Sequence, residues 1–353
     1  MSRFFSTKYD RLVPYTPGEQ PKDTEYIKLN TNESPYPPSE KAQEFAKAAA
    51  KRLELYPDPE CRELCNALAN RLGVSPDEVL PTNGSDEILN FAFMAYCDES
   101  HPAAFADITY GFYPVFAEIN RVPYDIIPLK EDFTINPEDY QGIGKTIFIA
   151  NPNAPTGIFL SIEKIEEILK SNPDNIVVID EAYVDFGNES CVPLIHRYDN
   201  LLVTQTFSKS RSMAGARLGV GIGNKALIRD LNTIKYSTNP YNINRMTMAA
   251  GLGALEDEEY TKECCRTIVE TREFTVNELA KLGFSMTKSS ANFLFAKHES
   301  ISGEKIYEEL KRRGILIRHF HKDKISDYNR ITIGTREQMQ TLIDTIKSIL
   351  EED

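Results

Sequence analysis

One lysine, Lys209, lies among small hydroxyl residues in the segment 204–219, and Arg217 follows eight residues later. The apolar run 201–203 before it predicts a buried strand. Desolvation in a dry pocket disfavours the ammonium form, so the amine becomes a usable nucleophile and base. This chemistry suits a Schiff base to a phosphorylated aldehyde cofactor, with the hydroxyls and Arg217 holding the phosphate. A lysine after a strand is more often a solvated surface residue, so the interpretation depends on finding the cofactor's other partners.

Two more predicted strands end in residues that suit such a cofactor. Asp180 follows the apolar run 176–179, and Tyr183 comes three residues later. A buried acid is costly without a cationic partner, and a pyridinium N–H is such a partner. Pairing with Asp180 would make the ring an electron sink, and Tyr183 could donate to its phenolic oxygen. Tyr110, after the run 103–106, offers a ring face for stacking. Because ligands bind at the carboxyl ends of strands in open α/β sheets, these positions indicate pyridoxal phosphate.

A phosphate site is also indicated around Gly84. The glycine is followed by Ser85, Asp86 and an apolar-periodic run, which predicts a helix whose first amides are free. Such amides bind phosphate. An ordinary capped helix has the same pattern, so the motif gains weight only together with Lys209 and Asp180.

The elements that must position these residues follow the pattern of a mostly parallel sheet with crossover helices. The predicted strands are 103–106, 146–150, 176–179, 201–203 and 217–223, and the predicted helices are 39–55, 60–72, 113–120 and 162–170. After about residue 245, helices at 247–254 and 258–281 precede strands at 293–295, 316–318 and 330–333 and a last helix at 336–351. We therefore expect an α/β protein with an N-terminal arm (1–30), a large cofactor-binding domain (31–245) and a small α/β domain (246–353).

Composition restricts the class of protein. The chain of 353 residues is 41% hydrophobic, and its net charge of -13 argues against a nucleic acid or an anionic membrane as partner. No apolar run approaches the roughly 20 residues that span a bilayer, and the first residues lack a secretory pattern. The six cysteines lack zinc or redox spacing, so we expect buried or incidental thiols in a cytoplasmic protein. His319 and His321 lack a carboxylate or cysteine cluster nearby, so we expect no metal site.

The chain resembles the fold-type I pyridoxal-phosphate aminotransferases, and within them the class II branch that acts on histidinol phosphate. The resemblance runs nearly end to end. It is carried by PYTPG (14–18), LNTNE (29–33), YPD (56–58), GSDE (84–87), TYGFY (109–113), NPNAPTG (151–157), DEAY (180–183), SK (208–209) and RITIGT (330–335).

The resemblance implies a role for each matching residue. Lys209 would form the Schiff base and move the proton between Cα and C4′, Asp180 would pair with the pyridine nitrogen, Tyr183 with O3′, and Tyr110 would stack on the ring. The residues around the cofactor phosphate would be Gly84, Ser85, Asp86, Thr206, Ser208 and Arg217. Tyr56 would reach the phosphate in the neighbouring subunit of a homodimer.

The substrate side is implied in the same way. Tyr15, Arg318 and Arg330 would hold the substrate's phosphate or the carboxylate of the amino-acid partner, and Asn32 belongs to the substrate-binding segment. The chain departs from the family at Ala154, where the family has an Asn that binds O3′, so we assign that role to Asn153. It also has Ser34 where the family has Asn.

The expected reaction converts L-histidinol phosphate and 2-oxoglutarate to imidazole acetol phosphate and L-glutamate in histidine biosynthesis. Two alternatives keep the fold: a threonine-phosphate decarboxylase or a broad aromatic aminotransferase. A third alternative is a binding or regulatory protein with a vestigial cofactor site. The intact set of Lys209, Asp180, Tyr183 and Arg217 argues against the third.

Overall fold

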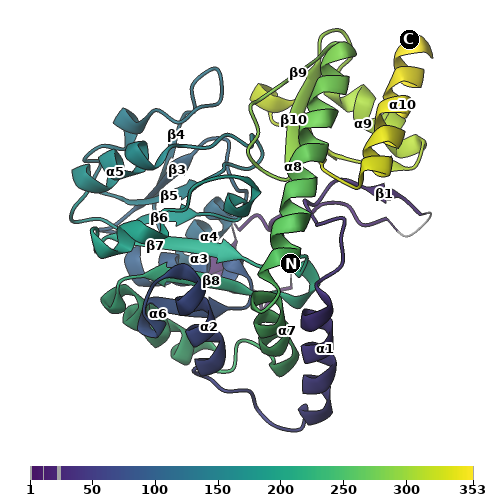
Figure 1. Cartoon of the computed structure of the whole chain (residues 1–353). Helices are drawn as coiled ribbons and strands as arrows, with labels where there is room; N and C mark the ends of the chain where they lie inside the picture. The colour runs from purple at the N-terminus through teal and green to yellow at the C-terminus, as the bar shows by residue number, and fades with distance from the viewer. Residues whose placement is uncertain (1, 11, 22–24, 353) are drawn as a thin grey trace.

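A seven-stranded sheet forms the centre of the larger lobe in the computed structural model, which describes residues 2–10, 12–21 and 25–352 (Figure 1). The strand order is β2 (Val79–Thr82), β8 (Gly219–Gly223), β7 (Leu201–Thr206), β6 (Val177–Asp180), β5 (Thr146–Ala150), β3 (Ala103–Ala106) and β4 (Tyr124–Ile127). β8 is antiparallel to both of its neighbours, and the other adjacent strands pair in parallel. The carboxyl ends of β3, β5, β6 and β7 therefore meet at one edge.

Helices cover both faces of this sheet because its central strands are apolar on both sides. Successive residues of β5 alternate between two cores: Ile147 and Ile149 pack in one, and Phe148 packs in the other. The first core is closed by α2 (Arg62–Leu72), α5 (Ile162–Ser171) and α7 (Arg245–Leu255). The second is closed by α3 (Ser85–Tyr96), α4 (Tyr113–Asn120) and α6 (Lys225–Thr238).

The smaller lobe is built on a four-stranded antiparallel sheet, drawn green to yellow at the upper right of Figure 1. Its order is β12 (Arg318–His319), β13 (Asn329–Thr332), β10 (Phe293–His298) and β9 (Phe284–Met286). α8 (Glu258–Lys281), α9 (Gly303–Arg312) and α10 (Arg336–Glu352) pack around it, and α8 descends from this lobe toward α7 (Figure 1). In addition, β1 (Ile27–Lys28) pairs in parallel with β11 (Ile315–Leu316).

The predicted α/β architecture, with a mostly parallel sheet and a smaller α/β lobe, is confirmed. The helix predicted over 39–55 is shorter: α1 spans Glu40–Ala49, starts from a Ser39 cap and passes into a 3-10 turn, Ala50–Arg52. The single strand expected at 316–318 is divided between β11 and β12. Strands β2, β4 and β9 and helices α6 and α9 were not expected.

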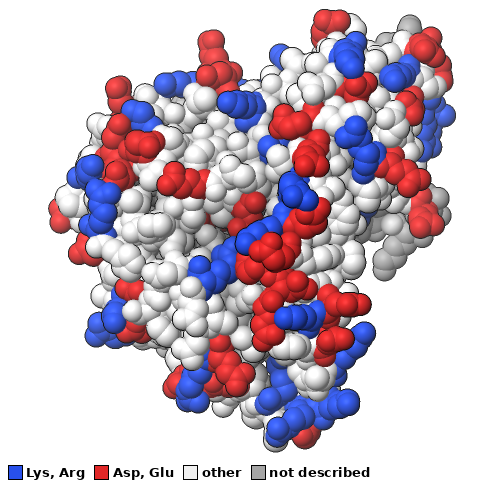
Figure 2. Space-filling model, viewed as in Figure 1, with Lys and Arg blue, Asp and Glu red and all other residues white. Residues whose placement is uncertain are grey.

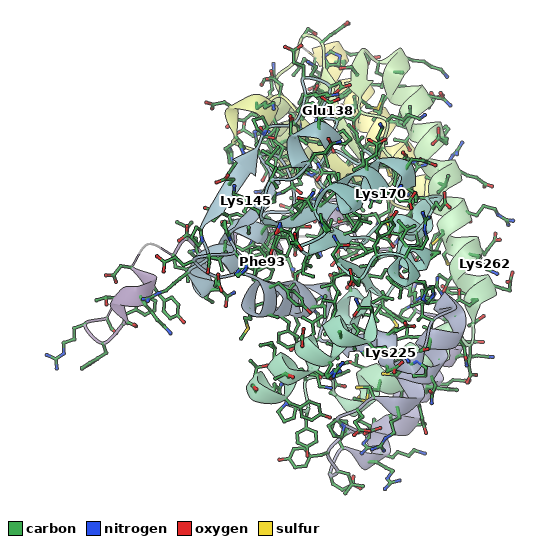
Figure 3. All side chains as sticks on the ribbon, turned by 90° about the vertical axis from the view of Figure 1, so that its left-hand side faces the viewer. Phe93, Glu138, Lys145, Lys170, Lys225 and Lys262 are labelled. Carbon is green, nitrogen blue, oxygen red and sulfur yellow. The ribbon has the colours of Figure 1, made fainter. Side chains whose placement is uncertain are left out.

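The domain boundary at residue 245 stays a prediction, and two packing contacts bear on it. α7, which follows that boundary, packs against α1, and β1, from the expected arm, pairs with β11. In the side view of Figure 3, the short 3-10 helix η1 (Thr7–Tyr9) stands away from the main body. Within the described ranges, none of the helices combines the length and the apolar character needed to cross a membrane.

Candidate active site

Two adjoining cavities lie where the carboxyl ends of the large sheet's strands meet the small lobe. We call them the inner cavity, of about 260 Å³, and the outer cavity, of about 470 Å³. The inner cavity is lined by Asp180 and Arg217, and the outer one reaches Arg318 and Arg330. Five residues line both: Thr31, Tyr110, Ala154, Tyr183 and Lys209. Lys209 therefore lies at the junction of the two spaces.

Lys209 is placed by the loop that follows β7. Its Nζ donates a hydrogen bond to the carbonyl oxygen of Thr31 at 3.2 Å and lies 5.9 Å from the ring centroid of Tyr183. Burial, followed by the positive charge of Arg330, lowers the pKa of the Lys209 ammonium to about 8. The fraction of neutral amine near pH 7 is therefore far larger than in a solvated lysine.

Asp180, the last residue of β6, is 5% exposed and faces the inner cavity. Its carboxylate accepts hydrogen bonds from Tyr113 Oη at 3.1 Å and from Thr204 Oγ1 at 3.2 Å, both neutral donors. In the described part of the chain it has no ion-pair partner, and burial raises its pKa to about 6. The cavity thus contains a carboxylate that a cationic N–H would stabilise.

An anion cup lies at the start of α3. Gly84 precedes the helix with φ +79°, and a Cβ atom there would lie 2.4 Å from Arg217 Nη2. The glycine therefore makes room for the guanidinium above the first turn. Arg217 Nη1 donates to Ser208 Oγ at 3.3 Å, and Thr206 Oγ1 lies 3.0 Å from the same oxygen. A guanidinium, two hydroxyls and free helix amides form a set of donors that suits a phosphate.

Asp86 connects the cup to the tyrosine that borders both cavities. Its carboxylate accepts from Tyr110 Oη at 2.6 Å and from Arg217 Nη2 at 3.1 Å. Burial, together with the charge of Asp86, raises the pKa of Tyr110 and keeps its hydroxyl protonated as a donor. Asp86 therefore fixes the Tyr110 ring and the Arg217 guanidinium in one arrangement.

Asn32 links Tyr183 to the small sheet. It is 1% exposed, and its Nδ2 donates to Tyr183 Oη at 2.9 Å. Its backbone N–H donates to Thr332 Oγ1 at 2.9 Å, and its Oδ1 accepts from the same hydroxyl at 3.1 Å. Through these bonds, Thr332 of β13 helps to hold Tyr183 in place.

Arg318 and Arg330 face each other in register across β12 and β13, and both line the outer cavity. Like charges at directly opposed positions destabilise a sheet. Neither guanidinium has an ion-pair partner in the ranges that the structure describes. They donate instead to backbone carbonyls: Arg330 to Asn30 at 3.0 Å, and Arg318 to Pro17 at 3.2 Å and Thr16 at 3.3 Å. Among the described residues, the buried Nε of Arg330 has no hydrogen-bond partner. These features make the two arginines suited to bind an anion.

The remaining predicted residues are placed as follows. Tyr15 lines the outer cavity and stacks on Phe112 with ring centroids 4.2 Å apart. Ser85 and Asp86 line the inner cavity. Tyr56 lines neither cavity, is 77% exposed and stacks on Tyr241.

Asn153 does not line either cavity, so the geometry gives no support to its predicted cofactor contact. Its side chain donates to the Ile108 carbonyl at 2.9 Å and to Thr156 Oγ1 at 3.0 Å, and accepts from Thr109 at 2.9 Å. Ala154 lines the cavities in its place. The amide of Asn153 is used to hold the turn after β5.

The site includes three residues that the sequence analysis did not assign: Tyr113 and Thr204, which bind Asp180, and Thr31, which binds Lys209. Thr204 could have been found, since strand β7 has polar residues only at its carboxyl end. The role of Tyr113 could not be predicted in this way, because its position matches the apolar side of α4.

Comparisons with known proteins agree with this geometry. Residues 24–346 match the family model described as aminotransferase class I and II. The chain is 47% identical over 351 residues to a histidinol-phosphate aminotransferase of Clostridium botulinum (strain Kyoto / Type A2), covering 99% of each protein. It is 48% identical over 353 residues to a protein of the same name from Brachyspira hyodysenteriae, covering 99% of this chain and 100% of that one.

A solved structure extends the likeness to three dimensions. The crystal structure of the histidinol-phosphate aminotransferase from Clostridium acetobutylicum has a TM-score of 0.85 and 26% identity, covering 93% of this chain and 100% of that chain. The agreement in sequence and in fold spans nearly the whole chain, and the chain therefore belongs to the family of class I and II aminotransferases.

Proposed function

We propose that this protein transfers the amino group of L-histidinol phosphate to 2-oxoglutarate, yielding imidazole acetol phosphate and L-glutamate in histidine biosynthesis. The two relatives at 47% and 48% identity, both called histidinol-phosphate aminotransferase, support this reaction. The observation that carries the substrate assignment is the in-register pair of Arg318 and Arg330, which lines the same cavity as Lys209 and has no acidic partner among the described residues.

The cofactor of this reaction would be pyridoxal phosphate, and the residues of the inner cavity fit it. When bound, it supplies an aldehyde that takes up amino groups and a protonated ring that accepts electrons. Asp180 would hold the protonated ring nitrogen, because the side chains that donate to its carboxylate in the described part of the chain, Tyr113 and Thr204, are neutral. Arg217, Ser208, Thr206 and the first amides of α3 would hold the phosphate.

Lys209 Nζ would then carry the proton that transamination moves. With a pKa of about 8, about a tenth of the amine is neutral at pH 7, so it can accept the proton from the substrate's Cα and return it. Tyr183, fixed by Asn32, and Tyr110, fixed by Asp86, border the same junction and orient the reacting groups. Arg330 contributes to the low pKa of Lys209, and an anion bound at Arg330 would partly offset that effect.

The outer cavity would select the substrate by its anionic end. A planar guanidinium binds phosphate or carboxylate through paired hydrogen bonds. Arg318 and Arg330, one on each strand, would both bind the phosphate of histidinol phosphate, and the side-chain carboxylate of glutamate would use the same place. The Tyr15 ring lies beside this space on the surface of Phe112.

A homodimer is part of the proposal, with Tyr56 reaching the phosphate site of the partner subunit. Tyr56 is exposed yet held in place: its ring stacks on Tyr241 at 4.6 Å, and its carbonyl accepts from Arg245 at 2.6 Å. Three residues later in the same loop, the Pro59 carbonyl accepts from buried Lys235 at 2.6 Å. An exposed aromatic side chain on so well-anchored a loop is suited to contact another molecule. The cytoplasmic location stays a prediction.

A substrate panel tests the proposed reaction. The purified protein, loaded with pyridoxal phosphate, is assayed for glutamate formation from 2-oxoglutarate with histidinol phosphate, histidinol and phenylalanine as donors. Carbon dioxide release is measured with O-phospho-L-threonine. We expect histidinol phosphate to have the highest kcat/KM, and histidinol to be at least about 100-fold poorer because it leaves the arginines unpaired. Equal use of histidinol, preference for phenylalanine, or carbon dioxide release at comparable rates would each refute the proposal.

A further inference from the structure

Five side chains behind the Lys209 loop form a closed set of contacts, which we call the charged ring: Arg71, Asp185, Ser210, Arg211 and Glu258. Ser210 Oγ donates to Asp185 at 2.5 Å. Arg71 bridges the two acids, with Nη2 3.4 Å from Asp185 and Nε 2.9 Å from Glu258. Arg211 Nη2 donates to the same Glu258 oxygen at 2.7 Å. Because Ser210 and Arg211 are neighbours in the chain, the ring closes through the backbone.

Arg211 is the most buried charge of the ring, with its side chain 3% exposed. Besides Glu258, it donates to the Ala254 carbonyl and to Thr261 Oγ1, each at 3.3 Å, and its guanidinium lies 5.1 Å from the Phe207 ring. These partners belong to the end of α7, the first turns of α8 and the active-site loop. A buried arginine with this many partners fixes the position of the backbone that carries it.

The ring lies next to the reacting residues without entering the site. Lys209 immediately precedes Ser210, and Tyr183 lies two residues before Asp185. Both Lys209 and Tyr183 line the two cavities, whereas no member of the charged ring lines either one. The Ser210–Asp185 hydrogen bond therefore joins the loop that carries the amine to the loop that carries the phenol. The Arg211–Glu258 ion pair then fixes these two loops to α8.

Other ion pairs on α8 are of a different kind. Figure 2 shows acidic and basic side chains alternating along the exposed side of this helix, and Lys262 points away from the body in Figure 3. The pair Arg266–Glu263 is typical of them, with side chains 65% and 57% exposed. Such surface ion pairs contribute little to the free energy of unfolding. In the charged ring the Arg211 side chain is 3% exposed and the Arg71 side chain 27%, so the buried member of the ring is Arg211.

We propose that the charged ring is a positioning device that holds the Lys209 amine at the junction of the two cavities, in fixed orientation to Tyr183. Ser210 and Arg211 act on Lys209 through the backbone, and neither side chain lines the inner or the outer cavity. This inference rests on the role proposed for Lys209 and goes beyond it, because it assigns the placement of the amine to residues outside the site.

The test measures the Lys209 amine directly in the cofactor-free full-length chain. Reductive methylation with formaldehyde and cyanoborohydride is followed across pH, and the peptide that contains Lys209 is quantified by mass spectrometry. Ser210→Ala is the decisive variant, because it opens the ring without changing any charge. We expect half-maximal reactivity near pH 8 in the wild type. In the variant it should move upward by about one pH unit, because a loosened loop lets water reach the amine. The charged groups that act on Lys209 are unchanged: Glu33, Asp86, Arg217 and Arg330.

A second measurement is the dissociation constant of pyridoxal phosphate, which should rise about tenfold in Ser210→Ala on loss of a charge-assisted hydrogen bond. Arg211→Met should behave in the same way, and Arg211→Lys, which keeps the contact to Glu258, should recover part of the change. Arg266→Met on the same helix is the matched control and should resemble the wild type. If Arg211→Met does not fold, Ser210→Ala still decides.

Unchanged reactivity and affinity in folded Ser210→Ala would overturn the inference, as would an equal shift in Arg266→Met. A wild-type chain whose cofactor is attached to a lysine other than Lys209 would instead refute the proposed function. The two failures are therefore distinguishable.

Discussion

A Cβ atom on Gly84 would lie 2.4 Å from Nη2 of Arg217, so the first residue before α3 and the arginine before β8 share one small space. The two lie far apart in the sequence. They meet because β2 and β8 are adjacent strands, with Thr82 opposite Gly219. Gly219 allows the same approach, since its own Cβ would lie 2.4 Å from the Ser85 nitrogen. The phosphate cup is therefore a consequence of backbone packing as much as of side-chain chemistry.

Gly84→Ala should weaken cofactor binding in the protein that still folds. The new methyl group would displace the Arg217 guanidinium from Asp86. The backbone at residue 84, with φ +79° and ψ 164°, has a conformation adopted almost only by glycine, so the variant should also lose about 1–3 kcal/mol of unfolding free energy. We expect the dissociation constant for pyridoxal phosphate to rise at least about tenfold, measured by fluorescence titration. Gly73→Ala is the control for a methyl group added at positive φ, because Gly73 has φ +71° with nothing within 4 Å of the added atom. Equal losses of affinity in both variants would contradict this account.

Asp180→Asn should stabilise the cofactor-free protein at neutral pH. The carboxyl has an ordinary pKa of 3.8 and a folded pKa of about 6, so the folded state binds its proton more tightly. The stability that this group contributes is therefore full below pH 3.8 and is lost as the pH rises through 6. Between pH 4 and pH 7 the wild type should lose about 2 kcal/mol of unfolding free energy relative to Asp180→Asn. Urea unfolding at both pH values measures this difference, and parallel pH dependences would contradict it.

The same substitution should have the opposite effect on catalysis. Once loaded with cofactor, Asp180→Asn should lose about 10²–10³-fold in kcat, because no carboxylate faces the ring nitrogen. A rate within about threefold of the wild type would show that another acid has this role. If Asp180→Asn both raises the unfolding free energy of the cofactor-free protein and lowers kcat, then Asp180 serves catalysis at the expense of stability.

Much of the fold could be predicted because the central strands are short apolar runs that end in polar residues. Helices α4 and α8 have the bounds expected from their periodicity. Strand β4 was missed because it is an edge strand with half its residues exposed, and β2 because Pro81 interrupts a four-residue run. Helix α6 could have been found, since an Asn224 cap precedes apolar residues at 227, 228 and 231.

Site residues that directly follow a strand could be predicted from the sequence. Site residues whose position depends on tertiary contacts could not. Lys209 and Asp180 follow apolar strands, so their location could be read from the chain. The orientation of Asn153 depends on the Ile108 carbonyl, which is brought near by the fold. The register that sets Arg318 opposite Arg330 depends on the loop between β12 and β13, which no local pattern determines.

Lys209 should carry the cofactor. Borohydride reduction of the loaded protein, followed by peptide mapping, should locate the pyridoxyl group on Lys209, since it is the lysine that lines the inner cavity among the described residues. Lys209→Ala should lose at least about 10²–10⁴-fold in kcat through loss of the proton carrier. Lys170→Met, which removes an exposed lysine of α5 that lines neither cavity, is the control for nonspecific damage. Wild-type turnover in Lys209→Ala would eliminate the assignment.

Arg330→Lys should separate substrate binding from cofactor binding. Lysine keeps the charge but cannot make paired hydrogen bonds to a phosphate. We expect unchanged cofactor affinity and unfolding temperature, with KM raised about tenfold or more for both histidinol phosphate and glutamate. Activity with histidinol, which has no phosphate, should fall little further. Arg312→Lys, on the exposed side of α9, should have no effect. A change in KM for only one of the two substrates would show that they use different anion sites.

Tyr56 should act across a subunit interface if the active unit is a homodimer. Its ring is 77% exposed and outside both cavities of its own chain, so Tyr56→Ala should leave the fold intact and still weaken cofactor binding. The sharper experiment mixes two impaired proteins, Lys209→Ala and Tyr56→Ala, under conditions that exchange subunits. A mixed dimer has one site with both substitutions and one site with an intact Lys209 and an intact Tyr56, so activity should appear that neither parent has. In the control mixture, Lys209→Ala is combined with Tyr9→Ala, a substitution in η1 away from the cavities. The activity of this mixture should equal that of its Tyr9→Ala subunits alone. Absence of recovered activity in a mixture shown by mass spectrometry to contain mixed dimers would place Tyr56 outside the neighbouring site.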